Sequence, residues 1–418
     1  MAARRGAVPG GRPAGRPGGR PGAHAPARTR VVWSPALLGY DFGVRHPMTP
    51  LRLDLTFRLA EQLGVLALPG VEVVGAEPAD DALVATAHTP DYIAAVRLAG
   101  TQGVPDEARG LGTEDDPVFP GMHDAAARLV TGSVESALAV WRGQARHAVN
   151  LAGGMHHAMP DRASGFCVYN DAVAAIRAVL AEGATRVAYL DLDAHHGDGV
   201  ERAFWDDPRV LTVSVHESGT TLFPGTGHPA DIGGPQAQGS VVNVALPAGT
   251  SDAGWLRAVQ SVALPVVRAF SPQLLVSQHG CDAHANDPLT NLAVSVDGLR
   301  AAALEVHDLA HDVAGGRWLA LGGGGYAIVQ VVPRIWTHLL AIAAHAPIDV
   351  ATPVPQAWRE HVEGTLGPPA PEVMGDGEAA GSPAPWSAGY DPGSPLDRSL
   401  LATRKHVFDW HGLDALYD

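Results

Sequence analysis

The chain of 418 residues contains 46% hydrophobic and 17% charged residues, a balance that excludes an intrinsically disordered protein and allows a large buried core. Its net charge is -15 although the first thirty residues contain seven arginines and no acidic residue, so we expect no stable nucleic-acid partner for the acidic remainder. Two cysteines, Cys167 and Cys281, make no disulfide framework and fit a reducing compartment. No apolar run reaches the ~20 residues of a membrane span. These features predict a cytoplasmic protein without a membrane partner.

The composition divides the chain into three parts. Residues 1–29 are rich in Pro, Gly and Arg, which predicts a disordered leader; a basic arm, a dispensable tail and a start codon assigned too early are open alternatives. Residues 30–350 carry regular strand and helix patterns and are predicted to form the principal folded domain. Residues 351–418 begin with a Pro/Gly-rich stretch and are expected to pack on that domain as a C-terminal extension.

Apolar strands alternate with helices along the chain. Strands are predicted at 31–33, 147–151, 187–190, 209–216, 241–246, 273–278 and 317–322. Helices are predicted from about 50, over 89–99, up to about 142, over 171–182, 200–205, 251–270 and 295–314, and from about 332. This alternation predicts an α/β fold with a single, mostly parallel β-sheet flanked by helices on both faces. Ligands bind such sheets at the carboxyl ends of the strands.

The stretch VAYLDLDAHHGDG at 187–199 concentrates ionisable side chains directly after a buried strand. Five such groups in eight residues would be costly to bury without partners, and a divalent metal ion is a suitable partner. Asp193 and His195, two apart on an extended segment, point to one side and can share an ion. Their chemistry suits zinc and would also suit manganese or iron. The alternative is a solvated Asp/His turn.

Three other loops with unusual chemistry also follow predicted strands: GGMHHA, QHGCD and GGGGY. Because the strands are predicted to be parallel, all four loops should converge on one edge of the sheet. Asp282, in QHGCD, can then reach the same ion, and the alternative is a helix cap or a loop turn. Tyr326, in GGGGY, can approach a ligand closely, and the alternative is a packing tyrosine.

The ordered motifs GGMHHA, GFCVYND, DLDAHHGDG, FPGTG, QHGCDAHANDPL and GGGGY resemble those of the zinc-dependent histone deacetylase superfamily. The resemblance covers residues 31 to 418 and is nearest to the acetoin-utilization-type bacterial deacetylases, which resemble class I enzymes. It implies an arginase/deacetylase-like fold and makes residues 30–350 the deacetylase catalytic domain.

The resemblance also implies the roles of individual residues. One catalytic Zn²⁺ is expected on Asp193, His195 and Asp282, and the sequence shows no second complete ligand set. His157 is expected to act as general base and then acid, with His156 assisting electrostatically. The remaining catalytic residues are expected to orient these imidazoles (Asp191 for His156, Asp198 for His157) or to stabilise the oxyanion (Tyr326).

The same resemblance implies a substrate tunnel and a structural K⁺ site. The tunnel is expected to be walled by Gly165, Phe166 and Phe223, with the rim residue Asp115 holding the substrate backbone; Asp116 adjoins it and makes that match loose. The predicted monovalent-cation residues are Asp191, Asp193, His195, Ser214 and Val215. A second cation site would use Phe204.

These inferences predict a zinc-dependent hydrolase that removes acetyl or related short acyl groups from lysine side chains of proteins. A metabolic enzyme such as an acyl-CoA synthetase is a candidate protein substrate. An acetylpolyamine amidohydrolase, a binuclear manganese ureohydrolase and a catalytically silent acyl-lysine-binding regulator are the alternatives. The sequence leaves the acyl preference, the metal used in the cell and the oligomeric state open.

Overall fold

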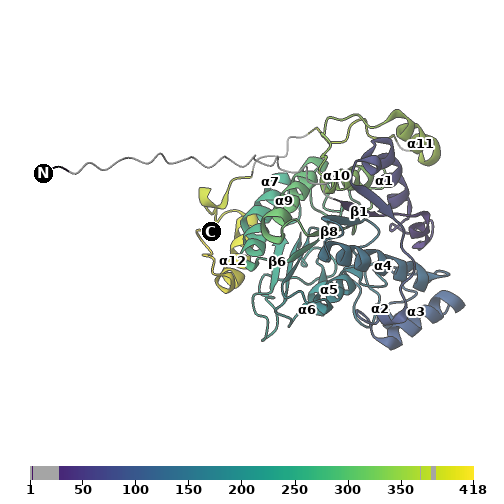
Figure 1. Cartoon of the computed structure of the whole chain (residues 1–418), viewed down its shortest axis with the longest axis horizontal. Coiled ribbons are helices and arrows are strands. Elements are labelled where there is room, and N and C mark those ends of the chain that lie inside the picture. The colour runs from purple at the N-terminus through teal and green to yellow at the C-terminus, as the bar shows by residue number, and fades with distance from the viewer. Residues whose placement is uncertain (1, 3–27, 368, 378–382) are drawn as a thin grey trace.

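The computed structural model describes residues 2, 28–367, 369–377 and 383–418, and an eight-stranded sheet lies at its centre (Figure 1). All strand pairs within it are parallel, in the order β2-β1-β3-β8-β7-β4-β5-β6. The strands are β1 (Thr29–Val32), β2 (Val71–Val74), β3 (His147–Asn150), β4 (Val187–Asp191), β5 (Val210–Glu217), β6 (Val241–Leu246), β7 (Leu274–Gln278) and β8 (Trp318–Leu321).

Helices cover both faces of this sheet, with α4, α5 and α6 on one side and α1, α7, α9 and α10 on the other (Figure 1). The helices are α1 (Leu51–Gln62), α2 (Asp81–Val84), α3 (Pro90–Gln102), α4 (Met122–Trp141), α5 (Asp171–Ala181), α6 (Asp198–Phe204), α7 (Asp252–Ala258), α8 (Leu264–Phe270), α9 (Val296–Ala314), α10 (Val332–Ala343), α11 (Gln356–Leu366) and α12 (Pro395–Val407). The predicted α/β architecture is thereby confirmed.

Double coverage explains the sequence pattern of the central strands. Every residue of β3, β4, β5, β7 and β8 is buried, which requires near-continuous apolar runs. Strand β2 differs, because it lies at the sheet edge with half of its residues exposed, and its short sequence VEVV was not predicted as a strand. The helix predicted over 251–270 is interrupted by a π-helical turn, Val259–Ala263. That wider turn directly precedes Pro265, which lacks the N–H of a regular helix.

The C-terminal segment lies against the sheet domain. Helix α12 packs on β6, and Asp397 binds Arg257 through both carboxylate oxygens, at 2.8 and 2.9 Å. The guanidinium of Arg404 is buried near the rings of Trp386 and Phe408. The predicted leader lies outside the described residues except for residues 2, 28 and 29, and the structure already places Thr29 in β1.

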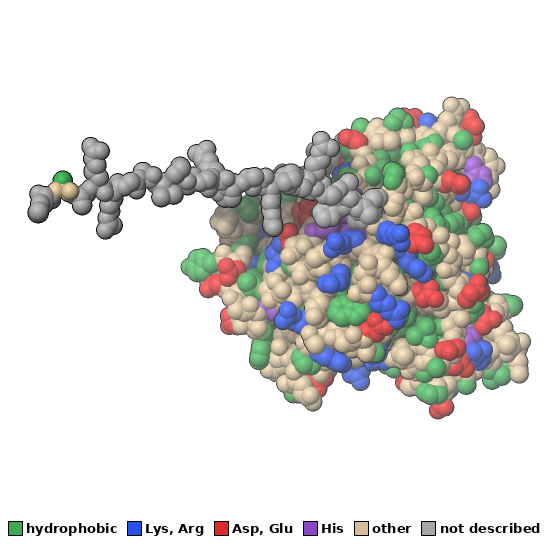
Figure 2. Space-filling model, in the orientation of Figure 1, with side chains coloured by type: hydrophobic (Ala, Val, Ile, Leu, Met, Phe, Trp, Pro, Cys, Tyr) green, Lys and Arg blue, Asp and Glu red, His purple; other side chains and the backbone are tan. Residues whose placement is uncertain are grey.

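The outer surface shows no long apolar helix among the described residues that could cross a membrane. On the face shown in Figure 2, acidic, basic and apolar side chains are intermixed. The distinctive chemistry is instead concentrated at the edge of the sheet where the strands end, which we call the carboxyl edge.

Candidate active site

The four chemically unusual loops follow four strands that are adjacent in the sheet, β3, β8, β7 and β4. Adjacent parallel strands end at the same edge, so the loops beginning at residues 151, 322, 279 and 192 meet there. Residues more than 170 positions apart in the sequence thereby come into contact.

Asp193, His195 and Asp282 form the buried centre of this edge. His195 Nδ1 lies 2.9 Å from Asp282 Oδ2 and 3.2 Å from Asp193 Oδ1, and the three ligand atoms all lie within 4.8 Å of one another. The outer oxygens are fixed by backbone donors: Gly324 N donates to Asp193 Oδ2 (2.7 Å) and Ala194 N donates to Asp282 Oδ1 (2.9 Å). Converging carboxylate and imidazole ligands with oriented outer partners fit a divalent metal ion.

The charges in this centre favour a cation. Burial alone would lower the pKa of His195, but its hydrogen bonds to the two carboxylates raise that pKa to about 10. Burial and the nearby charge of Asp193 raise the pKa of Asp282 to about 7. Two carboxylates forced together without water are stabilised by positive charge between them, whether a proton on His195 or a metal ion.

His156 and His157 lie beside this centre, and each is oriented by a carboxylate. His156 Nδ1 donates to Asp191 Oδ2 at 2.8 Å, and His157 Nδ1 donates to Asp198 Oδ1 at 2.7 Å. The two rings lie 4.0 Å apart between centroids. Each Nδ1 is thus occupied, which leaves Nε2 of each ring as the chemically available nitrogen.

The two imidazoles differ in their protonation. For His156, burial lowers the pKa, but Asp191 and Asp193 outweigh it and raise the pKa to about 9. For His157, burial and the neighbouring His156 lower the pKa to about 4, with Asp198 offsetting only part of the effect. The pair therefore combines a cationic ring with a neutral ring that can accept a proton.

Tyr326 lies at the end of the GGGGY loop, two residues after Gly324, which bonds Asp193. Its ring meets Phe166 edge to face, with 5.7 Å between centroids. Burial, together with Asp282 and Asp193, raises the pKa of its hydroxyl well above the usual range. The hydroxyl therefore stays protonated and can donate a hydrogen bond.

Gly165, Phe166 and Phe223, the predicted walls of the substrate slot, lie beside His157 and Tyr326. Phe223 is 44% exposed, and its ring meets His157 edge to face at 5.1 Å. A Cβ on Gly165 would lie 2.6 Å from His157 Cδ2 and 2.9 Å from Phe223 Cε1, and its φ of +55° is also left-handed. Only glycine therefore avoids a clash with the rings of His157 and Phe223 at this position. Burial raises the pKa of Cys167, which fits a wall residue and not a nucleophile.

Asp115 lies at the surface near this slot. Its carbonyl accepts a hydrogen bond from His46 Nε2 at 3.0 Å, and the His46 ring meets that of Phe166 with 4.6 Å between centroids. Asp116, by contrast, is buried, and burial together with Asp115 raises its pKa to about 8. Of the two adjacent acids, Asp115 is the one that a substrate can reach.

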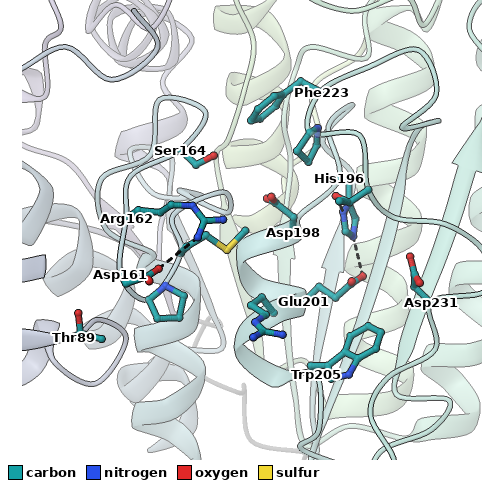
Figure 3. A pocket seen from close by; sticks show the side chains of 15 residues that line it. Thr89, Asp161, Arg162, Ser164, His196, Asp198, Glu201, Trp205, Phe223 and Asp231 are labelled. Carbon is teal, nitrogen blue, oxygen red and sulfur yellow. Dashed lines mark hydrogen bonds and ion pairs between the residues drawn. The ribbon is translucent and has the colours of Figure 1, made fainter. Parts of the chain in front are cut away.

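A groove of about 890 Å³ opens beside Phe223 (Figure 3). Its lining includes residues that follow β4, where His196 Nε2 donates to Glu201 Oε2 at 2.8 Å. Asp161 and Arg162, 3.6 Å apart, form its opposite wall. The groove is large enough for an extended chain segment next to the slot.

Of the predicted monovalent-cation residues, Asp191 ends β4, Asp193 and His195 follow it, and Ser214 and Val215 lie within the neighbouring β5. Asp191 is the register partner of Ser214, and Val215 follows in the same strand. The Asp191 carboxylate accepts from Asp193 N (3.0 Å) and Tyr189 Oη (2.7 Å), while Ser214 Oγ bonds His216 Nδ1 at 2.8 Å. Phe204, named for the second cation site, is buried in α6.

Sequence reasoning missed three residues that position the site. Asp171, at the start of α5, accepts from the backbone N–H groups of Gly154 and Met155 and so fixes the loop that carries the paired histidines. Asp287 accepts from Tyr326 N at 2.7 Å. Arg52 donates to the carbonyls of Gly323 and Gly325 and holds the GGGGY backbone. The sequence shows these three charged residues, but it does not show that the fold buries them next to the loops of the site.

Comparison with known proteins agrees with this geometry. Residues 46–343 match the model of the histone deacetylase domain. The chain is 42% identical over 330 residues to the acetoin utilization protein AcuC of Bacillus subtilis, which covers 78% of this chain and 84% of that protein. It is 38% identical to AcuC of Staphylococcus aureus strain MSSA476 (77% and 83% covered) and 37% identical to AcuC of Staphylococcus xylosus (79% and 86% covered). The chain therefore belongs to the histone deacetylase family of hydrolases and is AcuC-like over most of its length.

Proposed function

We propose that this protein is a zinc-dependent hydrolase that removes acetyl or related short acyl groups from lysine side chains of proteins. The observation that carries the proposal is the convergence of Asp193, His195 and Asp282 beside a neutral His157, with the loop that ends in Tyr326 bonded to Asp193 through Gly324. A silent acyl-lysine binder would need the ligand pocket but neither a proton acceptor nor an oxyanion donor.

Zn²⁺ bound by Asp193, His195 and Asp282 would polarise the amide carbonyl and acidify water. In the proposed reaction, His157 takes a proton from the attacking water and returns it to the leaving lysine nitrogen, so the C–N bond breaks to give a carboxylate and a free amine. Asp198 fixes the His157 tautomer through Nδ1. The Tyr326 hydroxyl donates to the carbonyl oxygen as that oxygen gains charge.

The surroundings support a lysine within a polypeptide as the substrate. The aromatic rings of Phe166 and Phe223 provide flat apolar walls for a four-carbon stem. The adjoining groove of about 890 Å³ offers room for flanking residues, which a short polyamine would not use (Figure 3). Asp115, exposed at the rim, supplies a carboxylate for a substrate backbone N–H.

The proposal also includes the setting of the reaction. We infer a cytoplasmic enzyme, because both cysteines are free and buried. A metabolic protein such as an acyl-CoA synthetase is the proposed substrate, in keeping with the acetoin-utilization names of the relatives. A structural K⁺ near Asp191, Ser214 and Val215 is part of the same proposal.

The test uses the purified full chain with acetyl-, propionyl- and butyryl-lysine peptides and with acetylated putrescine and spermidine. We expect release of free acid from the peptides with higher kcat/KM than from either polyamine. The Asp282→Asn variant should fold but lose turnover, since a buried ligand is removed. Faster hydrolysis of the polyamines, arginine hydrolysis with manganese, or peptide binding without turnover would each contradict the proposal.

A further inference from the structure

A second cluster of metal-ligating side chains lies at the opposite, amino edge of the sheet. It consists of His147, His307, His311 and His345, which we call the four-histidine cluster. One ring nitrogen from each lies within 4.8 Å of the others. His147 is the first residue of β3, His307 and His311 lie one turn apart on α9, and His345 follows the end of α10. The other end of β3 leads into the loop that carries His156 and His157, so the cluster is separate from the active site.

Two of the nitrogen–nitrogen distances in the cluster are close to those of tetrahedral coordination. His147 Nε2 lies 3.1 Å from His311 Nε2, and His307 Nε2 lies 3.3 Å from His345 Nδ1. Zinc–nitrogen bonds of about 2.0–2.1 Å in a tetrahedron place the nitrogens about 3.3–3.4 Å apart. In the absence of a shared cation, facing nitrogens at this distance need a proton between them.

The protonation and tautomers of these rings suit ligation. The pKa of every member is lowered, first by burial and further by the neighbouring imidazoles, and that of His147 falls to about 3. His147 Nδ1 donates to the carbonyl of Ala343 at 2.7 Å, which leaves the lone pair on Nε2. His307 Nδ1 faces Asp308 Oδ1 at 3.3 Å, with the same result. Metal-binding histidines are commonly oriented by such bonds through the second nitrogen.

His345 provides an independent observation. Its φ is +57°, and its N–H and that of Ala346 bond back to the carbonyls of Ile342 and Ala341 as α10 ends. Glycine is the usual residue in this left-handed position, because a side chain there is strained. The reversal of the chain here places His345 Nδ1 against His307 Nε2, at 3.3 Å.

The surroundings of the cluster permit entry and charge balance. His311 and His345 are exposed while His147 is buried, so a cation can enter from solvent and reach a dry inner ligand. Arg146 opposes a cation, but its guanidinium is engaged with the carbonyl of Gly315. Asp308 on α9 supplies negative charge nearby, whereas Asp312 is paired with Arg268 at 2.6 Å.

From this geometry we propose that the four-histidine cluster is a structural Zn²⁺ site that joins β3, α9 and the end of α10. Four neutral imidazoles leave no open position for a reacting water, so the ion stabilises the fold and takes no part in hydrolysis. The proposal is independent of the function of the carboxyl edge.

The first test measures zinc per chain by elemental analysis after dialysis of the full-length protein. We expect two ions in the wild type, one in Asp282→Asn and one in the double variant His307→Ala/His311→Ala. The double variant should keep its hydrolase activity. The matched control His361→Gln/His406→Gln removes two histidines on other helices and should keep both ions. A wild type with one ion that disappears in Asp282→Asn would overturn the proposal.

The second test uses His345→Gly, which removes one ligand and relieves the backbone strain. In the Asp282→Asn background, added Zn²⁺ should raise the Tm, and Co²⁺ should give the intense visible bands of a tetrahedral site. Adding His345→Gly to this background should abolish or greatly reduce both effects while the metal-free Tm is kept or raised. An unchanged Zn²⁺ response in His345→Gly would show that the histidines merely pack against Trp318, which lies 5.4 Å from His147 between ring centroids.

Discussion

Replacing Tyr326 with Phe separates catalysis from packing at the GGGGY loop. The ring contact with Phe166 and the backbone bond to Asp287 do not involve the hydroxyl. Within the described residues the hydroxyl makes no hydrogen bond, so its removal should change the free energy of unfolding by no more than about 0.5 kcal/mol. Loss of one oxyanion donor typically lowers the rate about 10²–10³-fold, or roughly 2.7–4 kcal/mol in activation free energy.

We therefore expect Tyr326→Phe to keep the wild-type Tm, zinc content and affinity for acetyl-lysine peptide, while kcat falls at least about a hundredfold. The bond strengthens only as the carbonyl oxygen gains charge, so kcat should fall more than KM rises. Steady-state kinetics, calorimetry and peptide binding test this, with Tyr417→Phe at the exposed C-terminus as control. Near-normal kcat combined with a lower Tm would refute the reasoning and make Tyr326 a packing residue.

Three further predictions concern the proton carrier, the C-terminal ion pair and the metal. His157→Ala should lower turnover by about 10²–10⁴ or more, and His156→Ala should leave measurable activity. The reverse ranking in peptide assays would show that His157 is not the ring that transfers the proton. Asp397→Asn should destabilise the protein by up to about 3–5 kcal/mol in urea unfolding at neutral pH, because it leaves the buried Arg257 without its counter-charge, whereas the exposed Asp312→Asn should cost about 1 kcal/mol or less. Burial raises the pKa of Asp397, but Arg257 lowers it below the usual value. The difference in free energy of unfolding between the wild type and Asp397→Asn should therefore be complete above about pH 4 and shrink as the pH falls through the folded-state pKa. A difference that grows on acidification would contradict this. Chelation should abolish hydrolysis, and zinc should restore it; full activity in metal-free enzyme would exclude the proposed chemistry.

The central strands and the family motifs could be predicted because their signals are local. A strand buried on both faces must be apolar throughout, and the predicted range 241–246 coincides with β6, Val241–Leu246. Helix starts are marked by capping side chains, such as Asn170 before α5 and Ser295 before α9. Strand β2 carries no such signal, since its edge position leaves it half exposed and it contains a glutamate.

Residues that hold the site in place were hidden because their partners are distant in the sequence. Arg52 bonds to carbonyls about 270 positions away, and nothing near it distinguishes it from a surface arginine. The choice between Asp115 and Asp116 likewise depends on which carboxylate the fold buries. Sequence spacing identifies groups that act within one loop, whereas burial and long-range bonds decide which isolated charges support them.

The four-histidine cluster, at the amino edge of the sheet, also could not be predicted from sequence spacing alone. The spacing of His307 and His311 on α9 places both on one helix face, but a pair of histidines alone does not make a site. The topology supplies the remaining ligands, because β3 begins at His147 and α10 ends beside it, where Thr29 Oγ1 and His147 Nδ1 both donate to the carbonyl of Ala343. Strand β3 thus begins at the proposed structural ion and leads, after its last residue, into the loop that carries His156 and His157. An ion that ties this strand to α9 and α10 would oppose local opening of the strand at its amino end and so raise the stability of the fold.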